Sequence, residues 1–209
     1  MANLISFIAM LGINLVLCAA LASLLCWKSD MRPWMGWVVA LFFTLLWVPL
    51  GTASLPVVAY IRGVSSDLSS TLVLLATVGL GRRIAGLPAL AQRERLVVYV
   101  AAAAAAVVLY PTALGWGDHD AYRLGWGSPL IWLILLAVCA GSWFCGFRLL
   151  PLLIAAGLLA WAVGLMESGN LWDYLLDPWL AVTALLQCVF ALIRKCRGRQ
   201  KPLAAMAAS

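Results

Sequence analysis

Long apolar runs separated by short polar loops occupy almost all of this 209-residue sequence. A helix needs about 20 apolar residues to cross a hydrocarbon core roughly 30 Å thick. Hydrophobic residues make up 65% of the chain and charged residues 11%, whereas soluble proteins contain roughly 45–50% apolar and about 25% charged residues. The sequence therefore predicts an all-α integral membrane protein, with no space for a soluble catalytic domain beside the spans.

The apolar runs predict a single membrane domain, residues 1–193, that forms a seven-transmembrane helical bundle. The first run lacks the basic start of a signal peptide and carries Asn14 at its centre, so we expect an uncleaved helix. A basic and then disordered cytoplasmic tail, residues 194–209, is expected after the last span. The expected spans are residues 4–27, 34–50, 66–81, 96–114, 129–147, 149–166 and 178–193.

The charges are distributed unevenly about these spans. Of the 14 Lys and Arg residues, all except Arg62 and Arg123 lie at the ends that would then share one side of the membrane. Cytoplasmic loops carry an excess of Lys and Arg, so we expect the N-terminus outside, in the periplasm, and the C-terminus in the cytoplasm. The same loops account for the net charge of +6 without a nucleic-acid partner. Abundant Ala and the excess of Arg over Lys are typical of a GC-rich bacterium, which predicts the bacterial inner membrane.

The segment between the second and third spans is irregular. In one geometry, a single long helix runs from about Pro56 to Leu80. In the other, residues 52–61 form a re-entrant segment, and the third span starts at Ser65 or Ser66 with a capping hydroxyl. The second geometry is favoured, because Pro, Gly and the cluster of Ser residues oppose an uninterrupted helix.

Small and polar residues inside the spans predict how the helices pack. Six consecutive alanines, residues 101–106, allow close approach of backbones, so the fourth span is expected at the centre of the bundle. Asn14 and Gln187 lie within the first and last spans. We expect both to face the interior and to form helix-to-helix hydrogen bonds.

Arg62 and Arg123 are the two cations that oppose the orientation bias, and each lies within five residues of an Asp. A guanidinium at that depth can bind a phosphate with two parallel hydrogen bonds, which points to an anionic lipid headgroup. The alternative is a structural pair with the neighbouring Asp, since ionisable groups in membranes usually pair with one another.

The outward loop between the fourth and fifth spans holds Asp118, His119 and Asp120 between two Gly-Trp-Gly tripeptides. With Asp67, these residues are the candidates for catalysis by general acid-base chemistry. A metal site is the weaker interpretation, because one cluster without other ligands predicts a metal poorly, and we expect neither a metal nor another cofactor. An ordered hairpin that serves structure or contacts a partner is favoured.

Three further outward residues are secondary candidates for the site: Tyr122, Asp173 and Asp177. The last two are one helical turn apart, which would place both carboxylates on one face of a short amphipathic turn. Trp172 and Tyr174 are then expected at the membrane interface.

The sequence lacks the motifs of familiar intramembrane chemistry. It has no GxSxG, HExxH or Walker motif. A single His cannot supply two haem ligands, and the last span has no Lys for a retinal Schiff base. We therefore favour a non-catalytic accessory subunit or assembly factor for envelope lipid or glycan machinery. Its expected partners are membrane lipids and either another membrane protein or a second copy of the chain.

Two other functions stay open at this point. The first is a membrane enzyme acting on a lipid-linked phosphorylated substrate at the outer leaflet, with the two outward arginines holding the phosphate and the candidate acids and His handling the proton. The second is a small oligomeric transporter or flippase, with the broken segment 52–61 as its gate.

Overall fold

The protein is mostly helical, and helices account for 76% of the computed structural model. The structure describes residues 2–26, 32–118 and 120–206. Among these residues, three helical stretches are long and apolar enough to cross a membrane, with 23, 22 and 19 residues: Asn3–Leu25, Gln92–Ala113 and Pro178–Cys196. These findings support a helical membrane protein.

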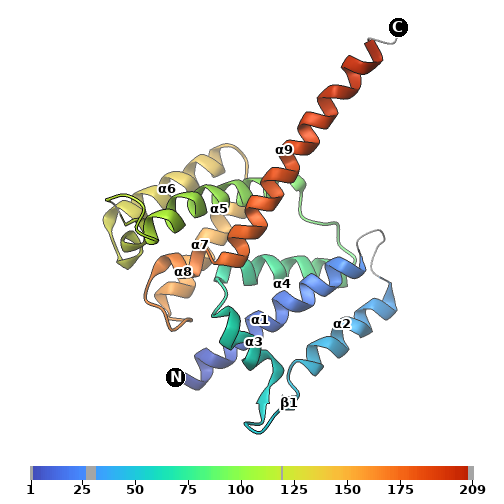
Figure 1. Ribbon diagram of the computed structural model, residues 1–209, viewed down its shortest axis with the longest axis vertical. Coiled ribbons are helices and arrows are strands. Elements are labelled where there is room, and N and C mark those ends of the chain that lie inside the picture. Colours follow the sequence, from blue (N-terminus) through green and yellow to red (C-terminus); the bar gives the residue numbers. More distant parts are fainter. Residues whose placement is uncertain (1, 27–31, 119, 207–209) are drawn as a thin grey trace.

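The elements follow one another along the chain with short connections (Figure 1). Two short strands, β1 (Pro49–Leu50) and β2 (Leu55–Pro56), pair antiparallel between the second and third helices. The helices are α1 (Ala2–Leu25), α2 (Pro33–Leu45), α3 (Val57–Ser65), α4 (Ser70–Ile84), α5 (Gln92–Ala113), the 3-10 helix η1 (Ala121–Trp126), α6 (Pro129–Phe144), α7 (Leu149–Ala162), α8 (Leu171–Leu175) and α9 (Pro178–Met206).

A helix overlaps each expected span, but several helices are shorter than the sequence predicts. Helix α7 has 14 residues and is about 21 Å long at 1.5 Å per residue. Glycines in the left-handed region explain two early ends. Gly146 (φ 82°) follows α6, and Gly164 (φ 65°) follows α7; each lies in a turn that satisfies the last carbonyls of its helix.

The last helix differs in the opposite direction. Helix α9 continues to Met206, beyond the expected end at residue 193. The sequence predicts a disordered tail there. Most residues of that tail are Ala, Arg, Lys, Gln, Leu or Met, which all have high helix propensity, whereas Gly198 and Pro202 oppose a helix.

The irregular segment is broken into a β-hairpin and two helices. Helix α3 ends where Ser66 adopts a positive φ of 60°, and α4 begins at Ser70. A single helix from Pro56 to Leu80 is therefore not what the chain forms. The expectation of a capping hydroxyl at Ser65 or Ser66 is wrong, because the side chain that caps α4 is Ser69, which accepts a hydrogen bond from the Leu72 N–H at 3.2 Å.

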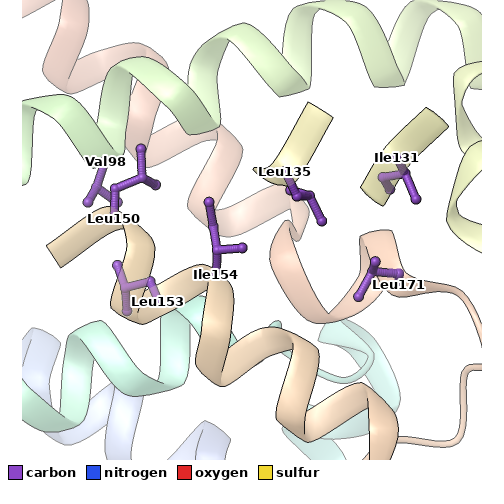
Figure 2. Packing of buried hydrophobic residues seen from close by; sticks show 7 residues of the cluster. All are labelled: Val98, Ile131, Leu135, Leu150, Leu153, Ile154 and Leu171. Atoms are coloured by element: carbon purple, nitrogen blue, oxygen red, sulfur yellow. The ribbon is translucent and has the colours of Figure 1, made fainter. Parts of the chain in front are cut away.

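A core of aliphatic side chains holds α5, α6, α7 and α8 together (Figure 2). Val98 of α5 packs with Leu153 and Ile154 of α7, while Ile131 of α6 and Leu171 of α8 extend the same cluster. Burying a side chain of this size stabilises a fold by about 1.5–3 kcal/mol in water. This cluster fixes the position of α8 against α6 and α7.

The alanine run of α5 packs on one face. Ala106 is buried against Leu180 and Ala181 of α9, whereas Ala104 is exposed. The run therefore allows close packing, as predicted. Helices of the same chain do not surround α5 at Ala104, where a central position in the bundle was expected.

Asn14 forms a buried link between α1 and α2. Its side-chain amide donates a hydrogen bond to the Phe43 carbonyl at 3.0 Å and accepts one from the Cys18 thiol at 3.3 Å. The predicted helix-to-helix hydrogen bond of Asn14 is confirmed. Gln187 is half-buried in α9.

Two polar contacts join helix ends where the basic loops lie. Arg83, in the last turn of α4, donates to the Ala22 carbonyl near the end of α1 at 3.2 Å. At the start of α5, the Glu94 carboxylate accepts hydrogen bonds from the N–H groups of Arg148 and Leu149 at 3.0–3.2 Å. Glu94 thus caps the N-terminus of α7 from a neighbouring helix.

Replacing this capping carboxylate should weaken the fold. We expect Glu94→Ala to lower the free energy of unfolding by about 1–2 kcal/mol, the usual cost of losing an N-cap acceptor. Equilibrium unfolding in detergent measures the change. Gln92→Ala, an exposed position in the same turn, is the matched control, and an equal loss there would show that Glu94 is not acting as a cap.

Candidate functional site

A cavity of about 830 Å³ lies where α3, η1 and the starts of α8 and α9 meet. Its volume is in the range of small-molecule sites, roughly 300–1,000 Å³. Apolar side chains of its wall include Met10, Leu109 and Leu176. The wall also carries the polar side chains Arg62, Asp67, Tyr110, Tyr122, Glu167, Ser168, Asp173 and Asp177.

Arg62 joins two segments of the cavity wall. Its Nε donates to Asp67 Oδ1 at 2.6 Å, and its Nη2 donates to Asp67 Oδ2 at 3.2 Å and to Glu167 Oε1 at 2.9 Å. The hydrogen bond with Asp67 is the main cause that raises the pKa of the guanidinium. Of the two roles considered for Arg62, the structure shows the ion pair, which ties α3 to the loop after α7.

Asp177 is the most buried acid of the cavity, with 4% of its surface exposed. Its Oδ2 accepts from the Ser69 N–H at 2.8 Å and from the Ser69 hydroxyl at 2.5 Å. Its Oδ1 accepts from the Leu180 N–H at 2.8 Å. One carboxylate therefore caps α9 and also binds the residue that caps α4.

Asp173, in the first turn of α8, accepts hydrogen bonds from two side chains. The Tyr122 hydroxyl lies 3.0 Å from its Oδ2 and 3.2 Å from its Oδ1, and the Ser168 hydroxyl donates to Oδ2. Burial, followed by the hydrogen bond with Asp173, raises the pKa of Tyr122 to about 12. The phenol therefore keeps its proton and acts as a hydrogen-bond donor at neutral pH.

A network of buried hydrogen bonds connects the segments that carry Tyr122, Ser168 and Asp173. Asn170 is fully buried and caps α8; its amide also donates to the Tyr122 carbonyl at 3.0 Å. The Tyr174 hydroxyl donates to the Ser168 carbonyl at 3.1 Å and accepts from the Met166 N–H at 3.1 Å. At Gly125 a Cβ would collide with the Asn170 side chain, so η1 approaches α8 closely only because this residue is glycine.

The structure brings together most, but not all, of the outward residues predicted for a site. Arg62, Asp67, Tyr122, Asp173 and Asp177 all line the cavity. The catalytic candidates Asp118 and Asp120 and the phosphate candidate Arg123 are exposed and do not line it. The third residue of the Asp-His-Asp cluster, His119, lies outside the described residues.

The loop around Asp120 is helical where a hairpin was expected. The Asp120 side chain accepts from the Tyr122 N–H at 2.9 Å and caps η1, and Gly127 ends this turn with a φ of 94°. Within the described ranges, no group of three or more His, Cys, Asp or Glu side chains lies close enough to hold a metal ion.

The predicted single helical turn over residues 173–177 is also wrong. Helix α8 ends at Leu175, and Leu176 is extended with φ −146° and ψ 130°. A proline disfavours helical backbone at the residue before it, and Pro178 starts α9 with Asp177 as the cap. The two acids reach the same cavity from different helices. Tyr174, expected at the interface, is instead buried with 1% of its surface exposed.

Several residues of the site carry little signal in the sequence. Ser69, Ser168 and Asn170 act through hydrogen bonds between segments about 50 to 110 positions apart or through local turns. Asn170 comes immediately before an apolar turn that includes Trp172. An Asn in this position is a sequence signal for the start of a helix, so its capping role could have been predicted. Nothing in the local sequence indicates that Tyr110 faces these residues.

No protein-family model matches this chain, and neither a curated protein nor a solved structure matches it. Proposals about function therefore depend on the geometry of the chain itself.

Removing the buried carboxylate should be the most damaging single change in this region. We expect Asp177→Ala to lower the free energy of unfolding by about 2–4 kcal/mol, because buried donors left without an acceptor cost about 1–3 kcal/mol each. Denaturant unfolding in detergent gives this value. Asp118→Ala, at an exposed acid of the neighbouring loop, should change it by less than about 0.5 kcal/mol; similar losses in both variants would contradict the capping role.

The raised pKa of Tyr122 predicts that this phenol loses its proton at a higher pH than an unfolded Tyr does. An unfolded Tyr has a pKa near 10, so the stabilisation from this proton is complete below pH 10 and is lost as pH rises toward 12. The difference in tyrosinate absorbance between the unchanged protein and Tyr122→Phe should therefore titrate with a midpoint near pH 12. A midpoint near pH 10 would show that Tyr122 is neither buried nor held by Asp173 in the folded protein.

Proposed function

We propose that this chain is a multi-pass protein of the bacterial inner membrane whose outward cavity binds the polar headgroup of a lipid or a lipid-linked glycan. In this proposal it serves as a non-catalytic accessory subunit or assembly factor of envelope lipid or glycan machinery. The observation that carries the proposal is the cavity of about 830 Å³, whose lining combines apolar side chains with charged and hydroxyl-bearing side chains. Sites for amphipathic ligands need both kinds of surface.

The proposed topology has seven crossings by α1, α2, α4, α5, α6, α7 and α9, with the N-terminus outside. On the proposed outer side, Arg62 pairs with Glu167 and Asp177 binds Ser69. Both contacts join segments that the charge distribution assigns to that side.

Contacts on the proposed inner side agree with the same arrangement. Arg83 donates to the Ala22 carbonyl, so the ends of α1 and α4 are neighbours. Glu94 caps the start of α7, so the starts of α5 and α7 are neighbours. The start of α1 and the end of α9 lie far apart in the molecule (Figure 1), which is compatible with an odd number of crossings.

The hydrogen bonds of the cavity favour binding over catalysis. Asp177 accepts three hydrogen bonds from the chain, and Asp173 accepts from two hydroxyl groups. A general base must reach the proton of its substrate, and these carboxylates are already engaged. Asp118 and Asp120, the centre of the enzymatic alternative, lie away from the cavity wall.

One observation favours the transporter alternative. Ser65, Ser66 and Asp67, at the break between α3 and α4, line the cavity, and interrupted helices often line the substrate sites of transporters. A proteoliposome flux assay distinguishes this function from a static binding role.

Labelling of single cysteines tests the topology. In a variant without the six native cysteines, Asp118→Cys should react with a membrane-impermeant maleimide added to intact spheroplasts. Gln92→Cys should react only after the membrane is opened, because it belongs to the proposed inner side. Labelling of both from the same side would exclude the proposed orientation.

A variant that fills the cavity tests the headgroup site. Ala59 of α3 lines the cavity, whereas Val64 on the same helix is 90% exposed and does not. We expect Ala59→Phe to reduce the lipid that co-purifies in mild detergent several-fold and Val64→Phe to leave it unchanged. Equal lipid content in both variants would count against the site, and a chain that always purifies without a protein partner would count against the accessory role.

A further inference from the structure

A second, apolar groove adjoins the cavity. It has a volume of about 260 Å³, lies between α1, α4 and α7, and shares Asp67 and Met166 with the wall of the first cavity. Small residues form much of its surface: Ala9 and Gly12 on α1, and Ala156 on α7. The first cavity and this apolar groove therefore adjoin each other.

The charges of the polar cavity are unbalanced. Among the described residues that line it, four carboxylates (Asp67, Glu167, Asp173 and Asp177) face a single guanidinium, Arg62. A cavity with this excess of negative charge attracts a cation and repels a ligand of net negative charge. Tyr110 and Tyr122 line the same space, and aromatic rings favour cations near their faces.

Arg62 nevertheless leaves one position for a phosphate. Its contacts with Asp67 and Glu167 use Nε and Nη2, so Nη1 takes no part in these ion pairs. A phosphate at Nη1 would lie beside the carboxylates of the same wall. A headgroup that carries both a phosphate and an ammonium group satisfies both requirements.

We propose that the two adjoining spaces bind one zwitterionic aminophospholipid, with its ammonium group near Glu167 and Asp173, its phosphate near Arg62, and one acyl chain in the groove beside Ala156. The inference rests on the proposed headgroup site and specifies its ligand class. It replaces the net anionic lipid expected from the sequence with a lipid of zero net charge.

Native mass spectrometry of the full chain tests the headgroup. The probes are phosphatidylethanolamine and phosphatidylglycerol with identical acyl chains. We expect phosphatidylethanolamine to bind about tenfold more tightly, a preference of about 1.4 kcal/mol. Glu167→Gln, at a side chain 65% exposed, should reduce this preference to about threefold or less. Asp173→Asn should act in the same direction, and Asp118→Asn, outside the cavity, should leave the preference unchanged.

A matched pair of variants on α7 tests the acyl chain. Ala156 lines the groove, whereas the adjacent Ala155 is exposed and does not. Ala156→Leu should weaken binding of the long-chain lipid severalfold and leave binding of glycerophosphoethanolamine, which has no chain, unchanged. Ala155→Leu should affect neither ligand.

The outcomes separate the two proposals. If phosphatidylglycerol binds as tightly as phosphatidylethanolamine and Ala59→Phe abolishes both, the headgroup cavity stands and the ligand class is wrong. If binding of both lipids is indifferent to Ala59→Phe, the cavity is not a lipid site and both proposals fail. Equal effects of Ala156→Leu and Ala155→Leu would overturn the role of the groove.

Discussion

The fold around the cavity depends on the interaction of one buried carboxylate with two helix starts. The N-termini of α4 and α9 lie side by side, because Ser69 and Leu180 both donate to Asp177. Each helix start carries a partial positive charge and unpaired N–H groups, so two adjacent starts repel each other unless an anion lies between them. Asp177 supplies that anion, and its position determines where α9 begins.

The wall of the cavity depends on the positions of α4 and α9, which the Asp177 carboxylate joins. Helix α8 lies just before Asp177 in the chain and presents Asp173 to Tyr122, while Glu167 reaches back to Arg62 on α3. Segments more than 100 positions apart thus share one hydrogen-bonded surface. The carboxylates of this surface accept hydrogen bonds from main-chain N–H, hydroxyl and guanidinium groups. The surface is therefore negatively charged, and among the described side chains no buried polar atom lacks a hydrogen-bond partner.

The sequence predicts where the helices of this chain lie better than it predicts the residues at which they end. It also predicts which residues line the cavity better than it predicts the hydrogen bonds between them. Apolar runs of about 20 residues are a direct signal for membrane-spanning helices. Arg62 could be singled out because it is a cation on the side of the membrane where few cations are expected. Helix ends depend on single residues: Gly146 and Gly164 stop two helices early. The contact between Ser69 and Asp177 could not be predicted because the two residues are distant in the chain. Asp118 and Asp120 were the strongest candidates for catalysis in the sequence, yet neither lines the cavity, and Asp120 instead caps η1.

The shortness of several helices has a consequence for the lipid around this protein. Helices α2 and α7 have 13 and 14 residues, which corresponds to about 20 Å, whereas α1 has 24. A bilayer adapts to short hydrophobic segments by thinning, at a cost of fractions of a kcal/mol per Å of mismatch. With the proposed crossings, the bilayer would be compressed beside α2 and α7 and of ordinary thickness beside α1. The protein would then gather in regions rich in short or disordered acyl chains, and its lateral distribution would follow membrane thickness.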